Sequence, residues 1–198
     1  FDLLVPNEDP AMSKGLERAY KKRGMELKLG NKFSEVTQDD NGVVVTLENG
    51  DSVAADLLLV AVGRGPNATG FGFEEQGITM DRGFVLTNER LQTNLPGVFA
   101  VGDMTPGLQL AHRGFMQGIF VAEEIAGLKP VVVDEMGIPR VTYCEPEIAS
   151  VGLTEAQAKE KFGADKISIY EYNLAGNGKS NILGTAGVIK LIREVDGP

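Results

Sequence analysis

The sequence is poor in the side chains that carry redox and metal chemistry. Its 198 residues include one cysteine, one histidine and no tryptophan. The single cysteine, Cys144, cannot form an internal disulphide, and no CxxC pair or Cys/His cluster with zinc-ligand spacing occurs. These absences exclude an internally disulphide-bonded fold and a zinc-finger module. Cysteine usage of this kind predicts a cytoplasmic protein.

The chain also lacks long apolar runs and an excess of positive charge. No run approaches the roughly 20 apolar residues of a membrane span, and no charged, then apolar, then small-residue leader is present. Acidic residues outnumber basic ones by 28 to 19, which gives a net charge of -9. We therefore expect neither nucleic acid nor a membrane among the partners. With 42% apolar and 24% charged residues, the composition predicts a globular protein of one or two domains.

Common catalytic and nucleotide-binding motifs are absent as well. The sequence contains no GxGxxG, GxxxxGK[ST], GxSxG or HExxH. It starts at Phe1 in an apolar stretch without a polar lead-in, so we expect the chain to begin within a fold.

Local signals predict a helix followed by a meander near the start. Asp9 and Pro10 form a helix N-terminus, an apolar position recurs every three or four residues, and Gly24 can adopt the left-handed cap. From residue 25 the period changes to two, with turn sequences at 40–42 and 49–51. We expect an antiparallel meander here.

The middle of the chain predicts an α/β layer. The apolar runs 56–63 and 97–102 are typical of strands covered on both faces, and 109–126 has helical spacing. The predicted apolar face of this helix consists of Leu110, Phe115, Ile119, Ala122 and Ile125.

The last third predicts an α+β arrangement. Strands are expected at 141–143 and 148–151, and Thr154 with Gln157 forms a capping box for a helix ending near residue 163. Residues 166–172 and 186–192 alternate as two paired strands. We expect their sheet to be incomplete.

The strongest candidate binding position is the end of the predicted strand 97–102. Asp103 would lie at the carboxyl edge of a parallel sheet, where a carboxylate can accept hydrogen bonds from a sugar or ribitol hydroxyl, and Gly102 allows close approach. The alternative is that Asp103 caps a turn. For His112 a packing or hydrogen-bonding role at the helix start is favoured over proton transfer. On local sequence alone, Gly63 is favoured as a plain turn glycine.

Four segments in order resemble the pyridine nucleotide-disulphide oxidoreductases, and above all the dihydrolipoamide dehydrogenases. They are LLLVAVGRGPN (57–67), TNLPGVFAVGD (93–103), LQLAHRGFMQG (108–118) and IPRVTYCEPEIASVGLTEAQA (138–158). The resemblance implies an α/β fold with parts of FAD- and NAD-binding Rossmann-like domains, then the start of an α+β interface domain that forms homodimers. The implied boundaries are 1–64 for the NAD part, 65–133 for the returning FAD and central part, and 134–198 for the interface domain.

The resemblance also implies FAD and NAD as cofactors and assigns residues to them. Asp103 matches the aspartate on the flavin ribitol, Gly63 the glycine against NAD, and Phe33 the position near the adenine. The stretch at the isoalloxazine edge matches Gln109, Leu110, Ala111 and His112.

Catalytic residues and metal ligands are not expected in this chain. In the family, the CxxxxC redox pair and both GxGxxG loops would precede Phe1, and the His/Glu pair would follow Pro198. Cys144 does not replace them. The segment RGFMQ (113–117) departs from the more acidic stretch of some relatives, which leaves the subfamily open.

The resemblance implies oxidation of protein-bound dihydrolipoyl groups, with lipoyl-bearing subunits of 2-oxo acid dehydrogenase complexes as partners. One alternative is another family member, such as a glutathione or mercuric reductase. A second, from a different class, is a noncatalytic binding or dimerisation module.

The first prediction is that the 198-residue chain alone has no turnover, because the redox pair, the cofactor loops and the acid-base pair are absent. Lipoamide-dependent NADH formation by the isolated chain measures this. Sustained formation would contradict the assignment.

Overall fold

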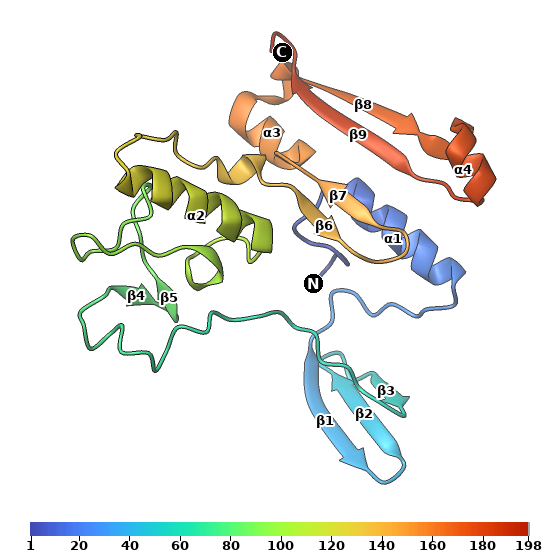
Figure 1. Cartoon of the computed structure of the whole chain (residues 1–198). Helices are drawn as coiled ribbons and strands as arrows, with labels where there is room; N and C mark the ends of the chain where they lie inside the picture. The colour runs from blue at the N-terminus through green and yellow to red at the C-terminus, as the bar shows by residue number, and fades with distance from the viewer. Residues whose placement is uncertain (198) are drawn as a thin grey trace. The chain divides into compact units, whose positions relative to one another are not determined.

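The computed structural model describes residues 1–197, which form two compact units (Figure 1). One unit combines Phe1–Val60 with the residues from Val141 onward, and the other is Ala61–Arg140. Among the described residues, no helix is both long and apolar enough to cross a membrane.

Helix α1 (Pro10–Lys22) begins where the sequence predicts it. The Asp9 side chain accepts a hydrogen bond from the Ala11 N–H at 3.0 Å, and Gly24 follows the helix with a φ of +83°. Leu16 and Ser13 form the buried side of the helix.

The predicted meander is a three-stranded antiparallel sheet of β1 (Phe33–Asp39), β2 (Gly42–Leu47) and β3 (Ser52–Ala55). Gly42 has a φ of +137°, and a Cβ there would lie 2.5 Å from the Ala55 carbonyl oxygen, so the turn requires glycine. Residues 25–29, which the alternation assigned to the meander, lie outside any strand.

The α+β arrangement of the last third is confirmed. Strands β6 (Arg140–Thr142) and β7 (Ile148–Ser150) form one sheet, and α3 (Glu155–Phe162) begins with the predicted capping box. Strands β8 (Ile167–Asn173) and β9 (Val188–Glu194) pair antiparallel, with α4 (Gly178–Leu183) between them in sequence. Short 3₁₀ turns flank β8: η3 (Ala164–Lys166) and η4 (Leu174–Gly176).

The other unit contains few regular strands. Its elements are β4 (Met80–Asp81), β5 (Phe84–Val85), the 3₁₀ turns η1 (Gly102–Met104) and η2 (Glu135–Gly137), and helix α2 (Ala111–Ile125). Its core consists of Ala68, Val85 and Ala100, against which Phe73, Ile78, Met80 and Met104 pack.

The prediction of two buried strands at 56–63 and 97–102 is wrong for the described structure. Residues 56–63 belong to no strand, and Leu57 and Leu59 are 88% and 87% exposed. In the second run, Phe99 forms only an isolated bridge with Gln92. A buried strand needs hydrogen-bonded neighbours on both sides, and no described strand lies beside either run.

Helix α2 forms as predicted but with its apolar face outward. Phe115 and Ile119 are 71% and 61% exposed. The buried side carries Arg113, Gln117 and Phe120 instead. The buried side of this helix therefore combines two polar side chains with one aromatic ring.

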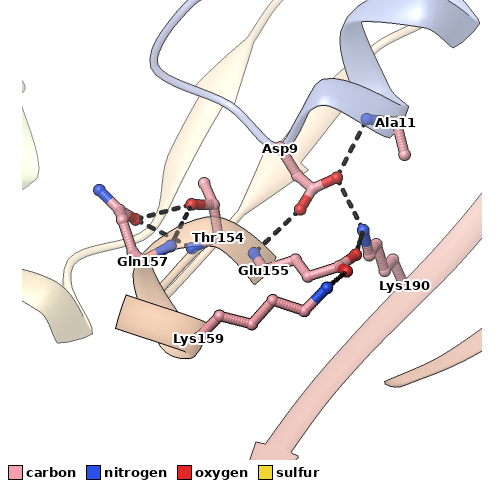
Figure 2. Close-up of polar contacts among 7 residues, drawn as sticks. All are labelled: Asp9, Ala11, Thr154, Glu155, Gln157, Lys159 and Lys190. Carbon is pink, nitrogen blue, oxygen red and sulfur yellow. Dashed lines mark hydrogen bonds and ion pairs between the residues drawn. The ribbon is translucent and has the colours of Figure 1, made fainter. Parts of the chain in front are cut away.

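The first unit contains a nearly buried ionic cluster (Figure 2). The Asp9 carboxylate accepts a hydrogen bond from the Glu155 N–H at 3.0 Å and from Lys190 Nζ at 2.9 Å. Lys190 also contacts the Glu155 carboxylate at 2.6 Å, and its side chain is 8% exposed. One aspartate thus accepts from the first turns of two helices and binds a strand residue 181 positions along the chain.

The cluster shifts the pKa of each member. Burial opposes the charge on Asp9, but donors from Lys190, Glu155 and Ala11 outweigh it and hold the pKa below 3.8. Hydrogen bonds from Lys159 and Lys190 lower the pKa of Glu155 below 4.5. Burial opposes the charge on Lys190, yet both carboxylates raise its pKa above 10.5.

The second prediction concerns the Lys190→Met variant. We expect its free energy of unfolding to fall by roughly 1.5–3 kcal/mol, because hydrogen bonds to charged groups are lost and two carboxylates remain face to face. Urea unfolding at pH 7 measures this. The control Lys179→Met, on the exposed part of α4, should change it by less than about 0.5 kcal/mol. Equal losses in both variants would contradict the role of the cluster.

The free energies of unfolding of wild type and Lys190→Met can also be compared as a function of pH. The carboxylates stabilise the fold fully above their ordinary pKa values of 3.8 and 4.5, and this stabilisation is lost as the pH falls through the lowered values. Lys190 stabilises it fully below 10.5, and its contribution is lost above the raised value. The difference between wild type and Lys190→Met should therefore be flat between about pH 5 and 10 and shrink outside that range.

Candidate functional site

The candidate site forms where η1 meets the start of α2. Gly102 has a φ of +75°, and a Cβ on Gly114 would lie 3.5 Å from the Gly102 Cα. The two glycines therefore let the turn and the helix backbone approach closely. The predicted neighbours Asp103 and Gln109 are brought together here, since Gln109 Nε2 donates to the Asp103 carbonyl oxygen at 3.4 Å.

The Asp103 carboxylate faces solvent. Asp103 is exposed, and within residues 1–197 no hydrogen bond or ion pair engages its carboxylate oxygens. A side chain that only capped a turn would accept a nearby N–H. Its acceptor capacity is unused within the described residues, so it can accept hydrogen bonds from water or from a ligand.

The start of α2 is open to an acceptor. Leu110 is the N-cap residue, in an extended conformation, and no side chain caps the helix. The first helical turn, which begins at Ala111, contains no acidic residue. The first N–H groups and the positive end of the helix dipole therefore favour a carbonyl oxygen or an anion at this point.

His112 is engaged with the backbone. Its Nε2 lies 2.7 Å from the Pro139 carbonyl oxygen. A carbonyl can only accept, so Nε2 carries the proton in this contact. The geometry favours the hydrogen-bonding interpretation of His112 over proton transfer.

The remaining two predicted residues lie outside this cluster. Gly63 is exposed with a φ of +121°, and nothing lies within 4 Å of its Cβ position. Phe33 is the first residue of β1, in the other unit, and is 62% exposed. Their assignments to NAD stay predictions.

Two residues that the sequence did not single out for binding hold the site together. Arg113 is 3% exposed and donates to the Pro106 carbonyl oxygen at 2.6 Å and to the Gly102 carbonyl oxygen at 3.4 Å. Gln117 is fully buried and accepts the Gly102 N–H at 2.7 Å. The available signal was their four-residue spacing, which places both on one face of the helix.

A second ion pair anchors the far end of α2. Arg90 Nε donates to the Glu124 carboxylate at 2.6 Å, and the guanidinium lies 5.2 Å from the Phe120 ring centroid. The hydrogen bond with Arg90 lowers the pKa of Glu124, and that with Glu124 raises the pKa of Arg90. The helix is thus fixed at both ends.

Comparison with known proteins gives a consistent family match. Residues 1–118 match the pyridine nucleotide-disulphide oxidoreductase family, and residues 138–197 match the dimerisation domain of that family. The dihydrolipoyl dehydrogenase of Bacillus subtilis is 42% identical over 203 residues, which cover 99% of this chain and 43% of that protein. The dihydrolipoyl dehydrogenase of Corynebacterium glutamicum is 36% identical over 206 residues, covering 99% of this chain and 44% of that protein.

Solved structures agree on the fold. LpdA from Mycobacterium tuberculosis superimposes with a TM-score of 0.86 at 26% identity, over 96% of this chain and 42% of that one. The HOCl-induced flavoprotein disulfide reductase RclA from Escherichia coli gives a TM-score of 0.86 at 28% identity, over 97% of this chain and 44% of that one. The chain spans less than half the length of these relatives.

The third prediction concerns Gly107→Ala. Gly107 has a φ of +125°, and a Cβ there would lie 2.5 Å from Arg113 Nη2. We expect the free energy of unfolding to fall by about 1–3 kcal/mol, because alanine strains the backbone at this φ and its Cβ displaces the Arg113 guanidinium. Thermal unfolding measures this. Gly118→Ala, in open space within α2, should instead stabilise by about 0.5–1 kcal/mol. An unchanged free energy of unfolding in Gly107→Ala would contradict the close contact between residue 107 and Arg113.

Proposed function

The chain belongs to the pyridine nucleotide-disulphide oxidoreductase family, and on that premise we propose that it is the flavin-facing and dimerising part of a dihydrolipoyl dehydrogenase. In this proposal the whole enzyme oxidises protein-bound dihydrolipoyl groups with NAD+, through FAD and a redox disulphide. The redox disulphide and the His/Glu pair are not among these 198 residues. The chain by itself is expected to be inactive.

The observation that carries the proposal is the exposed Asp103 carboxylate beside the uncapped start of α2. A flavin presents hydroxyl donors on its ribitol and carbonyl acceptors on its ring. The site offers the complementary set, a carboxylate acceptor and main-chain N–H donors, on a glycine-lined turn. The donor set therefore fits FAD.

Each residue has a distinct role in this proposal. Asp103 accepts hydrogen bonds from ribitol hydroxyls and so orients the cofactor. Gln109, Leu110, Ala111 and His112 place main-chain N–H groups at the isoalloxazine edge, where the helix dipole favours negative charge. Bound FAD supplies the electron transfer between disulphide and nicotinamide. The proposal also assigns Gly63 as a glycine against which NAD is bound, and Phe33 as a position near the adenine.

The names of the curated relatives support the lipoyl substrate, since those quoted above are dihydrolipoyl dehydrogenases. The fold likeness to a flavoprotein disulfide reductase keeps a second enzyme candidate, a reductase of another disulphide or of mercuric ion. Reduction of NAD+ by dihydrolipoamide, compared with NADPH oxidation by glutathione disulphide or Hg²⁺, separates these candidates. A noncatalytic module would do neither and would bind no flavin.

The proposal includes a second copy of the chain as partner, because residues 138–197 match a dimerisation domain. Lipoyl-bearing subunits of 2-oxo acid dehydrogenase complexes are the proposed macromolecular substrates. Cytoplasmic residence is part of the same proposal.

The fourth prediction tests the flavin site with Asp103→Ala in the protein that contains these residues. We expect the dissociation constant for FAD to rise by about ten- to a hundredfold, because a charge-assisted hydrogen bond is lost. Quenching of flavin fluorescence measures this. Asp40→Asn, an exposed turn residue of the other unit, serves as control. Unchanged affinity in Asp103→Ala would remove the residue from the site.

A further inference from the structure

Two buried polar side chains of α2, Arg113 and Gln117, both bind the Gly102 main chain and the Glu135 carboxylate. We propose that Gln117 is a positioning residue which, together with Arg113 and Glu135, sets the conformation of the turn that carries Asp103. The step from this turn to flavin binding rests on the function proposed above.

Gln117 uses both ends of its amide. Its Oε1 accepts the Gly102 N–H at 2.7 Å, and its Nε2 donates to Glu135 Oε1 at 3.1 Å. The residue is 0% exposed, so water cannot replace either partner. One end must accept and the other must donate, which an amide does and a carboxylate does not.

Arg113 completes the pattern from one helical turn earlier. Its Nη1 lies 3.4 Å from the Gly102 carbonyl oxygen, and its Nε donates to Glu135 Oε2 at 2.7 Å. Both polar groups of the Gly102 main chain and both oxygens of the Glu135 carboxylate therefore have partners on α2.

This arrangement constrains the residue that follows Gly102. Thr105 closes the turn, with its N–H and hydroxyl both donating to the Gly102 carbonyl oxygen at 3.0 and 2.8 Å. Asp103 sits inside this turn and has no side-chain partner among the described residues. Its direction is consequently set by the backbone, and the backbone by Gln117 and Arg113.

The charge pattern makes the idea specific. A glutamate at position 117 would place its carboxylate against that of Glu135, with Arg113 as the nearest cation and Asp103 in the adjoining turn. Two carboxylates in one site raise the pKa of one of them, so binding would become pH-dependent. Exchanging the groups, with Glu at 117 and Gln at 135, restores one donor and one acceptor at each contact.

The fifth prediction compares Gln117→Glu, Glu135→Gln and the double exchange in the protein that contains this chain. Main-chain amide hydrogen exchange of residues 101–105 reports the turn directly. We expect Gln117→Glu to speed it by about tenfold at pH 8 and less at pH 5, and the double exchange to restore it. FAD affinity and the flavin absorbance spectrum should follow the same order. The controls Gln76→Glu and Glu123→Gln, both at exposed positions, should change neither.

The outcomes are separable. Faster amide exchange in Gln117→Glu, restored in the double variant, supports the positioning role of Gln117. If the variants show this pattern but the wild-type protein binds no FAD, only the proposed flavin function fails. If Gln117→Glu changes neither the amide exchange rate nor the flavin affinity, the inference is overturned. It is also overturned if Gln117→Glu speeds exchange and adding Glu135→Gln does not restore the original rate. Circular dichroism of the double variant identifies a general failure to fold, which also counts against the matched pair.

Discussion

The candidate site depends on the burial of one guanidinium and one amide between α2 and the turn at residues 102–107. A buried charge without partners costs several kcal/mol, so Arg113 can occupy this position only with its acceptors in place. Its acceptors are main-chain oxygens of the turn and the Glu135 carboxylate. The requirement works in both directions, because the turn then has one conformation in which every buried group is satisfied. The apolar side of α2, with Phe115 and Ile119, contributes nothing to this attachment.

Elements specified by short-range chemistry were predicted correctly from the sequence. The cap at Asp9, the capping box of Thr154 with Gln157 and the two-residue turn before Gly42 each involve atoms a few residues apart. Spacing alone therefore determines them. The pairing of β8 with β9 was also predictable, because both strands alternate and they are neighbours in the order of strands along the chain. Family, fold class and the paired elements of the last third follow from these signals together with the four motif segments.

Errors arose where the outcome depends on what covers a segment. The runs 56–63 and 97–102 are apolar enough for buried strands, but a strand also needs neighbours, which the described residues do not supply. Apolar spacing identified helix α2 but did not indicate its buried residues, which include Arg113 and Gln117. Hydrophobic periodicity identifies apolar faces, but it does not indicate which polar side chains are buried because they have hydrogen-bond partners. Asp103 lies in a turn, as expected, although the strand predicted before it is absent, and its assignment to the flavin stays a prediction.

Two aspartates near helix starts show how geometry separates structure from binding. The oxygens of Asp9 accept from Ala11, Glu155 and Lys190, so all of its charge is compensated within the protein. The carboxylate of Asp103 accepts from no described residue, although its turn is fixed by three side chains. The turn is therefore held in place while its carboxylate stays exposed and able to accept hydrogen bonds from outside the chain. In the proposed function, the hydroxyl groups of a flavin ribitol supply donors that such a carboxylate can accept.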